Sequence, residues 1–187
     1  MRVDVPSGWL EGARRVPSPN HDARPEGVRP ELIVIHAISL PPGEFGGPWI
    51  DRLFTNRLDP QAHPFFREIA GLEVSAHLLI RRDGELVQYV PFHLRAWHAG
   101  VSSWRGREGC NDFSIGIELE GCDDRPFEDV QYERLAGAIL ALRRAYPSIA
   151  PDSLTGHADI APERKTDPGP HFRWATLWAA LGTTGLT

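Results

Sequence analysis

Cysteine is scarce in this chain, which has two cysteines in 187 residues. Neither Cys110 nor Cys122 belongs to a C-x-x-C pair, so a zinc site built from cysteines is not expected. The spacing of the two residues would by itself allow a disulfide bond. Two free thiols are the stronger expectation for a cytosolic chain, because that compartment keeps thiols reduced.

Long apolar runs and long basic runs are also missing. No apolar stretch approaches the roughly 20 residues that a membrane-spanning helix needs, and residues 1–16 lack the apolar core of a secretory signal. The formal net charge is -5, and no Lys/Arg tract marks a nucleic-acid surface. We therefore expect a cytoplasmic monomer with neither a membrane nor a nucleic-acid partner.

The pattern of apolar residues predicts an α/β protein. Hydrophobic residues make up 41% of the chain, which is ordinary for a globular protein, and the length suggests one domain over residues 1–187. Residues 1–30 have little periodicity and should form an extended arm packed on the core. Periodicity and an Asp-Gly turn predict strands over residues 32–36, 74–80, 86–90 and 113–120. Helical spacing predicts helices over residues 128–146 and 171–181, with a surface loop over 41–48 and a short helix within 49–70. Strands mixed with helices indicate one central sheet.

The loop over residues 156–170 carries the residue types of a metal-assisted hydrolytic site. It holds His157, Lys165 and Asp167, and it also contains three prolines, which stiffen the backbone. His36 ends the first apolar strand, where a ligand would be both fixed and accessible. Zinc accepts imidazole and carboxylate ligands, and catalytic sites commonly use three of them. The alternatives are that Asp167 caps a turn before Pro168 and that His36 is an ordinary hydrogen-bonded strand-end residue.

Acidic residues on the strand over 113–120 could supply a general base. Alternation places Gly116, Glu118 and Glu120 on one face of this strand. Two acids on one face of an apolar strand indicate either a solvated face or a site, since unpaired buried carboxylates are costly. One acid could serve as the base, and Gly116 would leave room for substrate. Lys165 could stabilise an oxyanion, although most lysines are simply solvated.

The other histidines are weaker candidates as metal ligands. His77 could line the same face as the acids, and His98 could contact a ligand from its loop. The remaining histidines lie next to or near prolines and are expected on the surface or in structural roles. They are His21, His63, His93 and His171.

Seven ordered blocks of sequence resemble the zinc-dependent N-acetylmuramoyl-L-alanine amidases that are related to peptidoglycan recognition proteins. Among these, the chain is most similar to the AmpD family of cytosolic 1,6-anhydro-N-acetylmuramyl-L-alanine amidases. The blocks are ARRVPSP (13–19), ISLPPGEFGG (38–47), SAH (75–77), IRRDGE (80–85), RAWHAGVSS (95–103), CNDFSIGIELEG (110–121) and GHADIAPERKTDPGP (156–170). They cover nearly the whole chain.

The resemblance implies a fold, a site and a reaction. The fold is a mixed central β-sheet flanked by helices. The zinc (Zn2+) ligands fall on His36, His157 and Asp167, and the catalytic residues on Glu118 and Lys165. The implied substrate is a small anhydromuropeptide, cut between 1,6-anhydro-N-acetylmuramic acid and L-alanine in peptidoglycan recycling. Two rival functions are a non-catalytic muropeptide-binding module and a broader amidase that also cuts polymeric peptidoglycan.

Two positions depart from the pattern of the family. Ala37 stands where close relatives usually have asparagine, and Gly109 stands where they often have arginine. Both are expected near the substrate groove, so substrate contacts could differ while the metal ligands and base are kept. Basic groove residues would suit the carboxylates of a muropeptide. The candidates are Arg95, Arg105 and Arg107.

Overall fold

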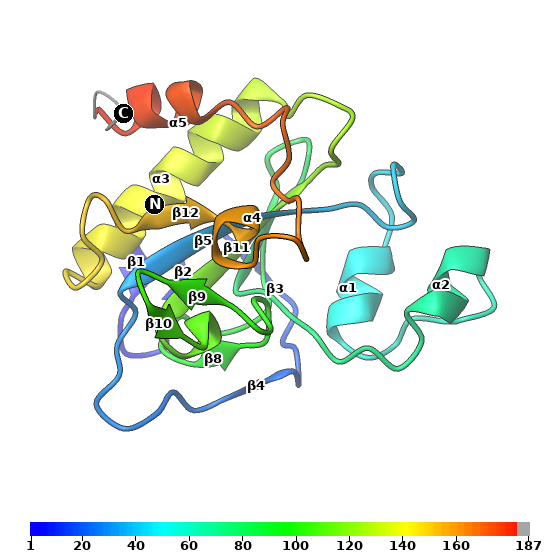
Figure 1. Ribbon diagram of the computed structural model, residues 1–187, viewed down its shortest axis with the longest axis horizontal. Coiled ribbons are helices and arrows are strands. Elements are labelled where there is room, and N and C mark those ends of the chain that lie inside the picture. The colour runs from blue at the N-terminus through cyan, green and yellow to red at the C-terminus, as the bar shows by residue number, and fades with distance from the viewer. Residues whose placement is uncertain (183–187) are drawn as a thin grey trace.

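A six-stranded mixed sheet lies at the centre of the computed structural model, which describes residues 1–182 (Figure 1). The strand order is β12-β5-β11-β6-β7-β3. The strands are β12 (Leu154–Gly156), β5 (Leu32–Ile38), β11 (Ser114–Glu120), β6 (Leu78–Ile80), β7 (Leu86–Gln88) and β3 (Arg14–Arg15). The last five residues of the expected domain lie outside the described range.

The parallel strands β12, β5, β11 and β6 position the candidate site, because their carboxyl ends meet at one edge of the sheet. β5 and β11 are the longest strands, and their β-branched residues suit a sheet that is covered on both faces. The register places Glu118 directly opposite His36. Two residues separated widely in the sequence are thereby brought side by side.

The predicted hairpin is confirmed, although its regular pairing is shorter than expected. β6 and β7 pair antiparallel over three residues each, and Gly84 takes a positive φ of 85° in the turn between them. Beyond the paired region, His77 donates its backbone N–H to Gly116 and accepts from Tyr89. Regular strand structure nevertheless begins only at Leu78, and the chain bends at His77.

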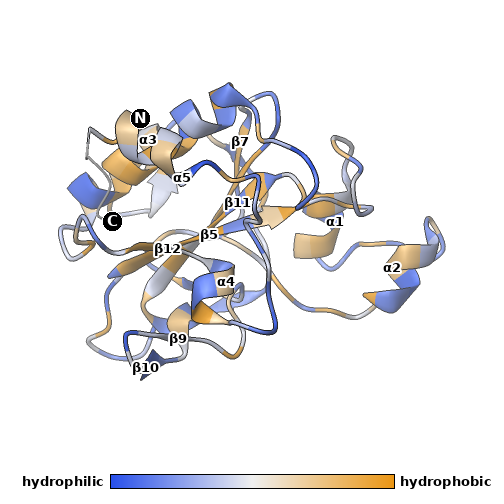
Figure 2. Ribbon diagram, turned by 45° about the horizontal axis from the view of Figure 1, so that its top comes forward, coloured by the Kyte–Doolittle hydropathy of each residue, from blue (hydrophilic) through white to orange (hydrophobic). Residues whose placement is uncertain are grey.

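One face of the sheet is covered by α3 (Asp129–Ala145) and α5 (Trp174–Ala180), which lie side by side in Figure 1. Ile115, Ile117 and Leu119 of β11 pack into the same core as apolar residues of α3. Figure 2 shows the apolar character of the central strands. Both helices were predicted from their spacing. Glu128 and Gln131 bond each other's backbone at the start of α3, and Pro147 follows its end.

The opposite face carries short elements and long loops. Region 49–70 holds two helices rather than the expected one, α1 (Trp49–Phe54) and α2 (Pro64–Glu68). His63 caps α2 by accepting the Phe65 N–H, which explains its place beside a proline. The remaining elements are η1 (Cys110–Asp112), α4 (His157–Ile160) and the β9 (Ser103–Trp104) and β10 (Arg107–Glu108) pair.

The N-terminal arm contains more β-structure than its sequence predicts. β1 (Val3–Asp4) pairs with β2 (Trp9–Leu10), β3 extends the central sheet along β7, and β4 (His21–Asp22) pairs with β8 (Arg95–Ala96). The four strands of the arm, β1 to β4, have two residues each, which is too short for a periodic pattern. Within residues 1–182, no helix has the length and apolar character needed to cross a membrane.

Candidate metal centre and active site

Three candidate ligands converge at the carboxyl edge of the sheet. His36 lies in β5, His157 begins α4 directly after β12, and Asp167 lies in the loop that follows. The two Nδ1 atoms are 2.9 Å apart, and each lies 3.1 Å from Asp167 Oδ2. Both imidazoles are buried, while the carboxylate is partly exposed.

The donor set fits a tetrahedral cation such as zinc. Ligand atoms about 2.1 Å from a shared ion would be about 3.4 Å apart in a tetrahedral site, a few tenths of an ångström more than the separations seen here. Burial lowers the pKa of His36 to about 4, so this imidazole is neutral at pH 7. Neutral imidazole and ionised carboxylate are the forms that bind a metal.

The loop after α4 is held against the ligands by its own backbone. Ala158 donates its N–H to the carbonyl of Asp167 at 2.8 Å, which ties the start of α4 to the ligand-bearing segment. His157 Nε2 lies 3.2 Å from the carbonyl oxygen of Ala99. Arg164 donates to the same carbonyl at 2.6 Å. Backbone contacts on both sides therefore restrict how His157 and Asp167 can move.

Glu118 and Lys165 face the same cavity as the three ligands. The cavity has a volume of about 280 Å³ and is lined by all five residues. Glu118 is 8% exposed, and its Oε2 has no hydrogen-bond partner. Burial, reinforced by the charge of Asp167, raises the pKa of Glu118 well above its ordinary value. Such a carboxyl group is a stronger base than a solvated one.

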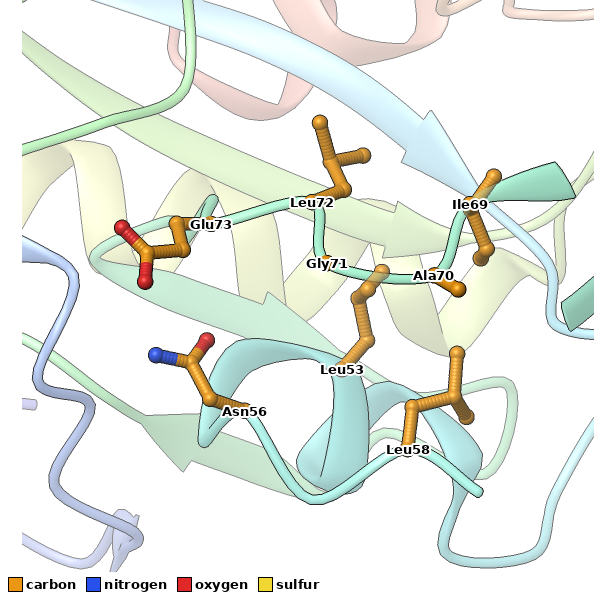
Figure 3. A pocket seen from close by; sticks show the side chains of 8 residues that line it. All are labelled: Leu53, Asn56, Leu58, Ile69, Ala70, Gly71, Leu72 and Glu73. Atoms are coloured by element: carbon orange, nitrogen blue, oxygen red, sulfur yellow. The ribbon is translucent and has the colours of Figure 1, made fainter. Parts of the chain in front are cut away.

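The cavity continues away from the ligands along an apolar wall. This wall comes from α1, α2 and the segments around them, and it was not predicted from the sequence. Its members are Leu40, Leu53, Phe54, Phe65, Ile69, Leu72 and Val74. Beyond it, a smaller hollow of about 110 Å³ lies between α1 and residues 69–73, where Asn56 and Glu73 add polar groups (Figure 3). Leu53, Ile69 and Leu72 border both spaces.

Comparison with known proteins identifies the family. The family model described as N-acetylmuramoyl-L-alanine amidase matches residues 26–170. This chain belongs to that family. The amidase is 66% identical over 178 residues to the 1,6-anhydro-N-acetylmuramyl-L-alanine amidase AmpD of Enterobacter cloacae, covering 95% of each chain. It is 69% identical over 168 residues to AmpD of Escherichia coli, covering 90% of this chain and 91% of the relative.

Solved structures confirm the predicted fold of the amidase. A crystal structure of a Se-Met AmpD derivative matches with a TM-score of 0.93 and 64% identity, covering 97% of this chain and 99% of the other. A complex of Escherichia coli AmiD with the substrate anhydro-N-acetylmuramic acid-L-Ala-D-gamma-Glu-L-Lys matches with a TM-score of 0.60 and 32% identity. It covers 87% of this chain and 62% of AmiD. The mixed sheet flanked by helices is thus shared.

Several residues that the sequence placed near the groove of the amidase have other roles. Glu120 is buried in an ion pair with Arg81, with 3.1 Å between Oε1 and Nη1. Gly109 lies outside the cavity and takes a positive φ of 71° at the start of η1, which favours glycine there. Ala37 does line the cavity. Gly109 instead borders a separate hollow of about 550 Å³, together with Val101 and Arg164.

The three arginines named as groove candidates do not line this cavity, and each forms an ion pair instead. Arg95 pairs with Asp22 and Asp112, which fastens β8 to the N-terminal arm and to η1. The other two form ion pairs on the surface, Arg105 with Asp152 and Arg107 with Glu31. Sequence position alone could not reveal these partners, because each acid is remote in the chain. The cavity itself is lined by the cation Lys165 and not by these arginines.

The space beside Gly116 is also filled, so the expected room for substrate is not there. A Cβ atom at this position would lie 2.5 Å from a ring atom of His98. His77 is a structural residue, since its Nδ1 accepts the Gly116 N–H and its Nε2 lies 3.0 Å from the Leu94 carbonyl. Both cysteines are free, as predicted.

Proposed function

We propose that this chain is a zinc amidohydrolase that cleaves the amide bond between 1,6-anhydro-N-acetylmuramic acid and L-alanine in muropeptides of peptidoglycan recycling. The observation that carries the proposal is the convergence of three metal-type donors beside a buried, unpartnered glutamate. It is supported by relatives named for this activity that match over nearly their full length.

His36, His157 and Asp167 would hold the zinc ion. When bound, zinc supplies a Lewis acid and lowers the pKa of water. Glu118 takes the proton from the attacking water and returns it to the leaving amine, a role that its raised pKa suits. Lys165 places a positive charge in the same cavity, where it stabilises the developing oxyanion. The apolar wall gives the same cavity a hydrophobic side beside these polar groups.

The assignment of Glu118 is tested by Glu118→Ala in the zinc-loaded protein. We expect the variant to keep stoichiometric zinc while its turnover of a soluble anhydromuropeptide falls by about 10²- to 10⁴-fold, because only the proton transfer is lost. Metal analysis and mass spectrometry of the products measure the two quantities. Wild-type turnover in this variant would remove Glu118 from the mechanism. Intact substrate with zinc-loaded wild-type protein would instead favour a binding module.

The substrate assignment is tested by a parallel assay on soluble anhydromuropeptides and on intact sacculi. We expect release of the peptide from the soluble substrate only. Comparable release from sacculi would support the broader amidase activity. The single domain over residues 1–187, the cytoplasmic location and the monomeric state are predictions that belong to the same proposal.

A further inference from the structure

A further histidine, the half-buried His98, supports the ligand His36 from behind. His36 Nε2, the ring nitrogen that points away from the ligand cluster, lies 2.9 Å from His98 Nδ1. The two rings meet edge to face, with centroids 4.9 Å apart. On its far side, His98 Nε2 lies 3.1 Å from Ser114 Oγ. Ser114 in turn donates its hydroxyl hydrogen to the carbonyl of Cys110 at 2.5 Å.

The carbonyl at the end of this series fixes the position of every hydrogen in it. A carbonyl oxygen can only accept, so the hydroxyl of Ser114 must donate to it. Ser114 Oγ is then the acceptor for a hydrogen on His98 Nε2. With Nε2 protonated, neutral His98 has a lone pair on Nδ1 and accepts a hydrogen from His36 Nε2. The lone pair of His36 is thereby left on Nδ1, the atom that faces His157 and Asp167.

We propose that His98 and Ser114 are positioning residues that hold His36 in the Nε2–H tautomer and so present Nδ1 to the metal. The proposal rests on the metal-binding role given above to His36. It explains why a histidine with both ring nitrogens engaged lies beside the ligand cluster without belonging to it. A ligand imidazole commonly donates its other N–H to an outer partner, and that partner affects metal affinity.

The second ligand imidazole is oriented in a shorter way. His157 Nε2 faces the carbonyl of Ala99 directly at 3.2 Å, which leaves its Nδ1 as the lone pair toward the cluster. Backbone carbonyls therefore orient both imidazoles. His157 bonds directly to one, and His36 is connected to another through the side chains of His98 and Ser114. The Cys110 carbonyl belongs to η1, so this short helix is part of the support of the metal site.

Gly116 provides the space in which His98 lies. A Cβ atom at residue 116 would be 2.5, 2.6 and 2.8 Å from three ring atoms of His98. The φ angle of Gly116 is not in the positive range. Glycine is therefore required at this position by the limited space and not by the backbone conformation. The ring of His98 is thus packed against the strand that carries both Ser114 and Glu118.

The tautomers can be measured by ¹⁵N NMR of the imidazoles in the full-length protein, with zinc bound and after chelation. We expect protonated Nε2 in both His36 and His98 in each state, with scalar coupling across the hydrogen bond between His36 Nε2 and His98 Nδ1. A chelated protein with the proton on Nδ1 of His36 would overturn the proposal. This measurement needs no variant, so it stands even where a substitution prevents folding.

The contribution to metal binding is measured by zinc competition against a chromophoric chelator. His98→Phe should weaken zinc affinity by about 10- to 100-fold. Ser114→Ala should weaken zinc affinity less. Ser114→Thr, which keeps the hydroxyl group, should have the zinc affinity of the wild type. His77→Gln is the matched control, because His77 also lies beside Gly116 but its ring nitrogens contact the Gly116 N–H, the Leu94 carbonyl and Arg24 Nη2, and not His36. It should lower stability and keep zinc affinity.

Two outcomes separate this inference from the proposed function. Folded His98→Phe protein with wild-type zinc affinity overturns the positioning role while leaving the amidase assignment intact. Wild-type protein that shows the expected tautomers but neither binds zinc nor hydrolyses the muropeptide supports the hydrogen-bond series and contradicts the proposed function.

Discussion

The surroundings of Glu118 disfavour the ionised form of its carboxyl group. It is buried, one of its oxygens has no partner, and its pKa is raised by burial and by Asp167. A buried group of this kind opposes folding when it is ionised. Such an arrangement is typical of a residue kept for reactivity and not for stability. A cation bound by the neighbouring ligands would favour the ionised form.

Glu118→Gln should therefore stabilise the metal-free protein in a pH-dependent way. The folded protein binds the Glu118 proton more tightly than the unfolded chain does, because the pKa of Glu118 is raised on folding. Glu118 therefore does not reduce the stability of the wild type below its ordinary pKa of 4.5, where it is protonated in both states. The wild type loses stability as the pH rises through the raised pKa, because Glu118 must then ionise in a buried position. The variant and the wild type should have similar melting temperatures near pH 4.5. The variant should melt at a higher temperature by pH 8. Glu133→Gln, on the exposed side of α3, is the matched control, and a difference that is constant with pH would contradict the argument.

Gly116 and Gly137 should respond oppositely to the same substitution. Gly116→Ala forces a methyl group against the His98 ring, and overpacking of this kind costs about 1–3 kcal/mol. Gly137 lies within α3, where an added methyl group meets only the flexible side chain of Met1 at 3.2 Å. Gly137→Ala should stabilise by about 1 kcal/mol through helix propensity. Urea unfolding measures both, and a neutral Gly116→Ala would mean that His98 can move aside.

At the scale of elements, Glu120 fastens three segments together. Its carboxylate accepts from Arg81 Nη1 at 3.1 Å, from the Arg82 N–H at 3.3 Å and from the Gly46 N–H at 2.7 Å. It thereby connects the end of β11 with the hairpin turn and with the loop over residues 41–48. That loop leads from the ligand strand β5 to α1, which forms part of the apolar wall.

Glu120→Ala should destabilise the protein by about 3–5 kcal/mol, because it leaves the guanidinium of Arg81 buried with a weaker set of partners. The cut sites of a protease should appear first within residues 41–48, where the Gly46 contact is lost. Chemical unfolding and limited proteolysis with mass spectrometry measure the two effects. Glu44→Ala, at an exposed position in the same loop, is the control. Unchanged stability of Glu120→Ala would show that Asp51 and Glu85 suffice for Arg81.

The sequence predicted those elements whose pattern is long enough to be periodic. β5, β11 and α3 were found close to their observed bounds, since each has a continuous apolar face. The two-residue strands of the arm were missed because pairing partners, and not local propensity, make them strands. The five proposed site residues could be named from the sequence through family resemblance, and they lie around one cavity. The support of His36 by His98 could not be named, because it depends on a side chain whose position follows from the space at Gly116.

At the scale of the whole molecule, the candidate metal centre joins β5, the start of α4 and the loop that follows it. A ligand that binds only the folded state stabilises it in proportion to the logarithm of its concentration over Kd. A bound zinc ion should therefore raise the stability of the entire cooperative unit. The effect should not be confined to the loop over residues 161–170.

Zinc at about 1,000 times its Kd should stabilise the protein by about 4 kcal/mol, and removal by a chelator should reverse the shift. Differential scanning calorimetry with and without zinc measures it. Asp167→Ala removes one ligand and should abolish most of the shift, while the metal-free variant should remain folded. Asp123→Ala is the matched control, since Asp123 lines a neighbouring hollow with Asp167 but lies outside the ligand cluster. An undiminished zinc shift in Asp167→Ala would contradict the ligand assignment.

The order of the ligands along the chain has a consequence for biosynthesis. His36 and Asp167 are 131 residues apart, and His157 lies between them near the end of the sequence. A ribosome therefore synthesises the segments of β5 and β11, which carry His36 and Glu118, before either remaining ligand exists. No nascent chain that stops short of residue 167 can assemble the three-donor set. A chain that stalls before residue 167 therefore cannot acquire the complete site.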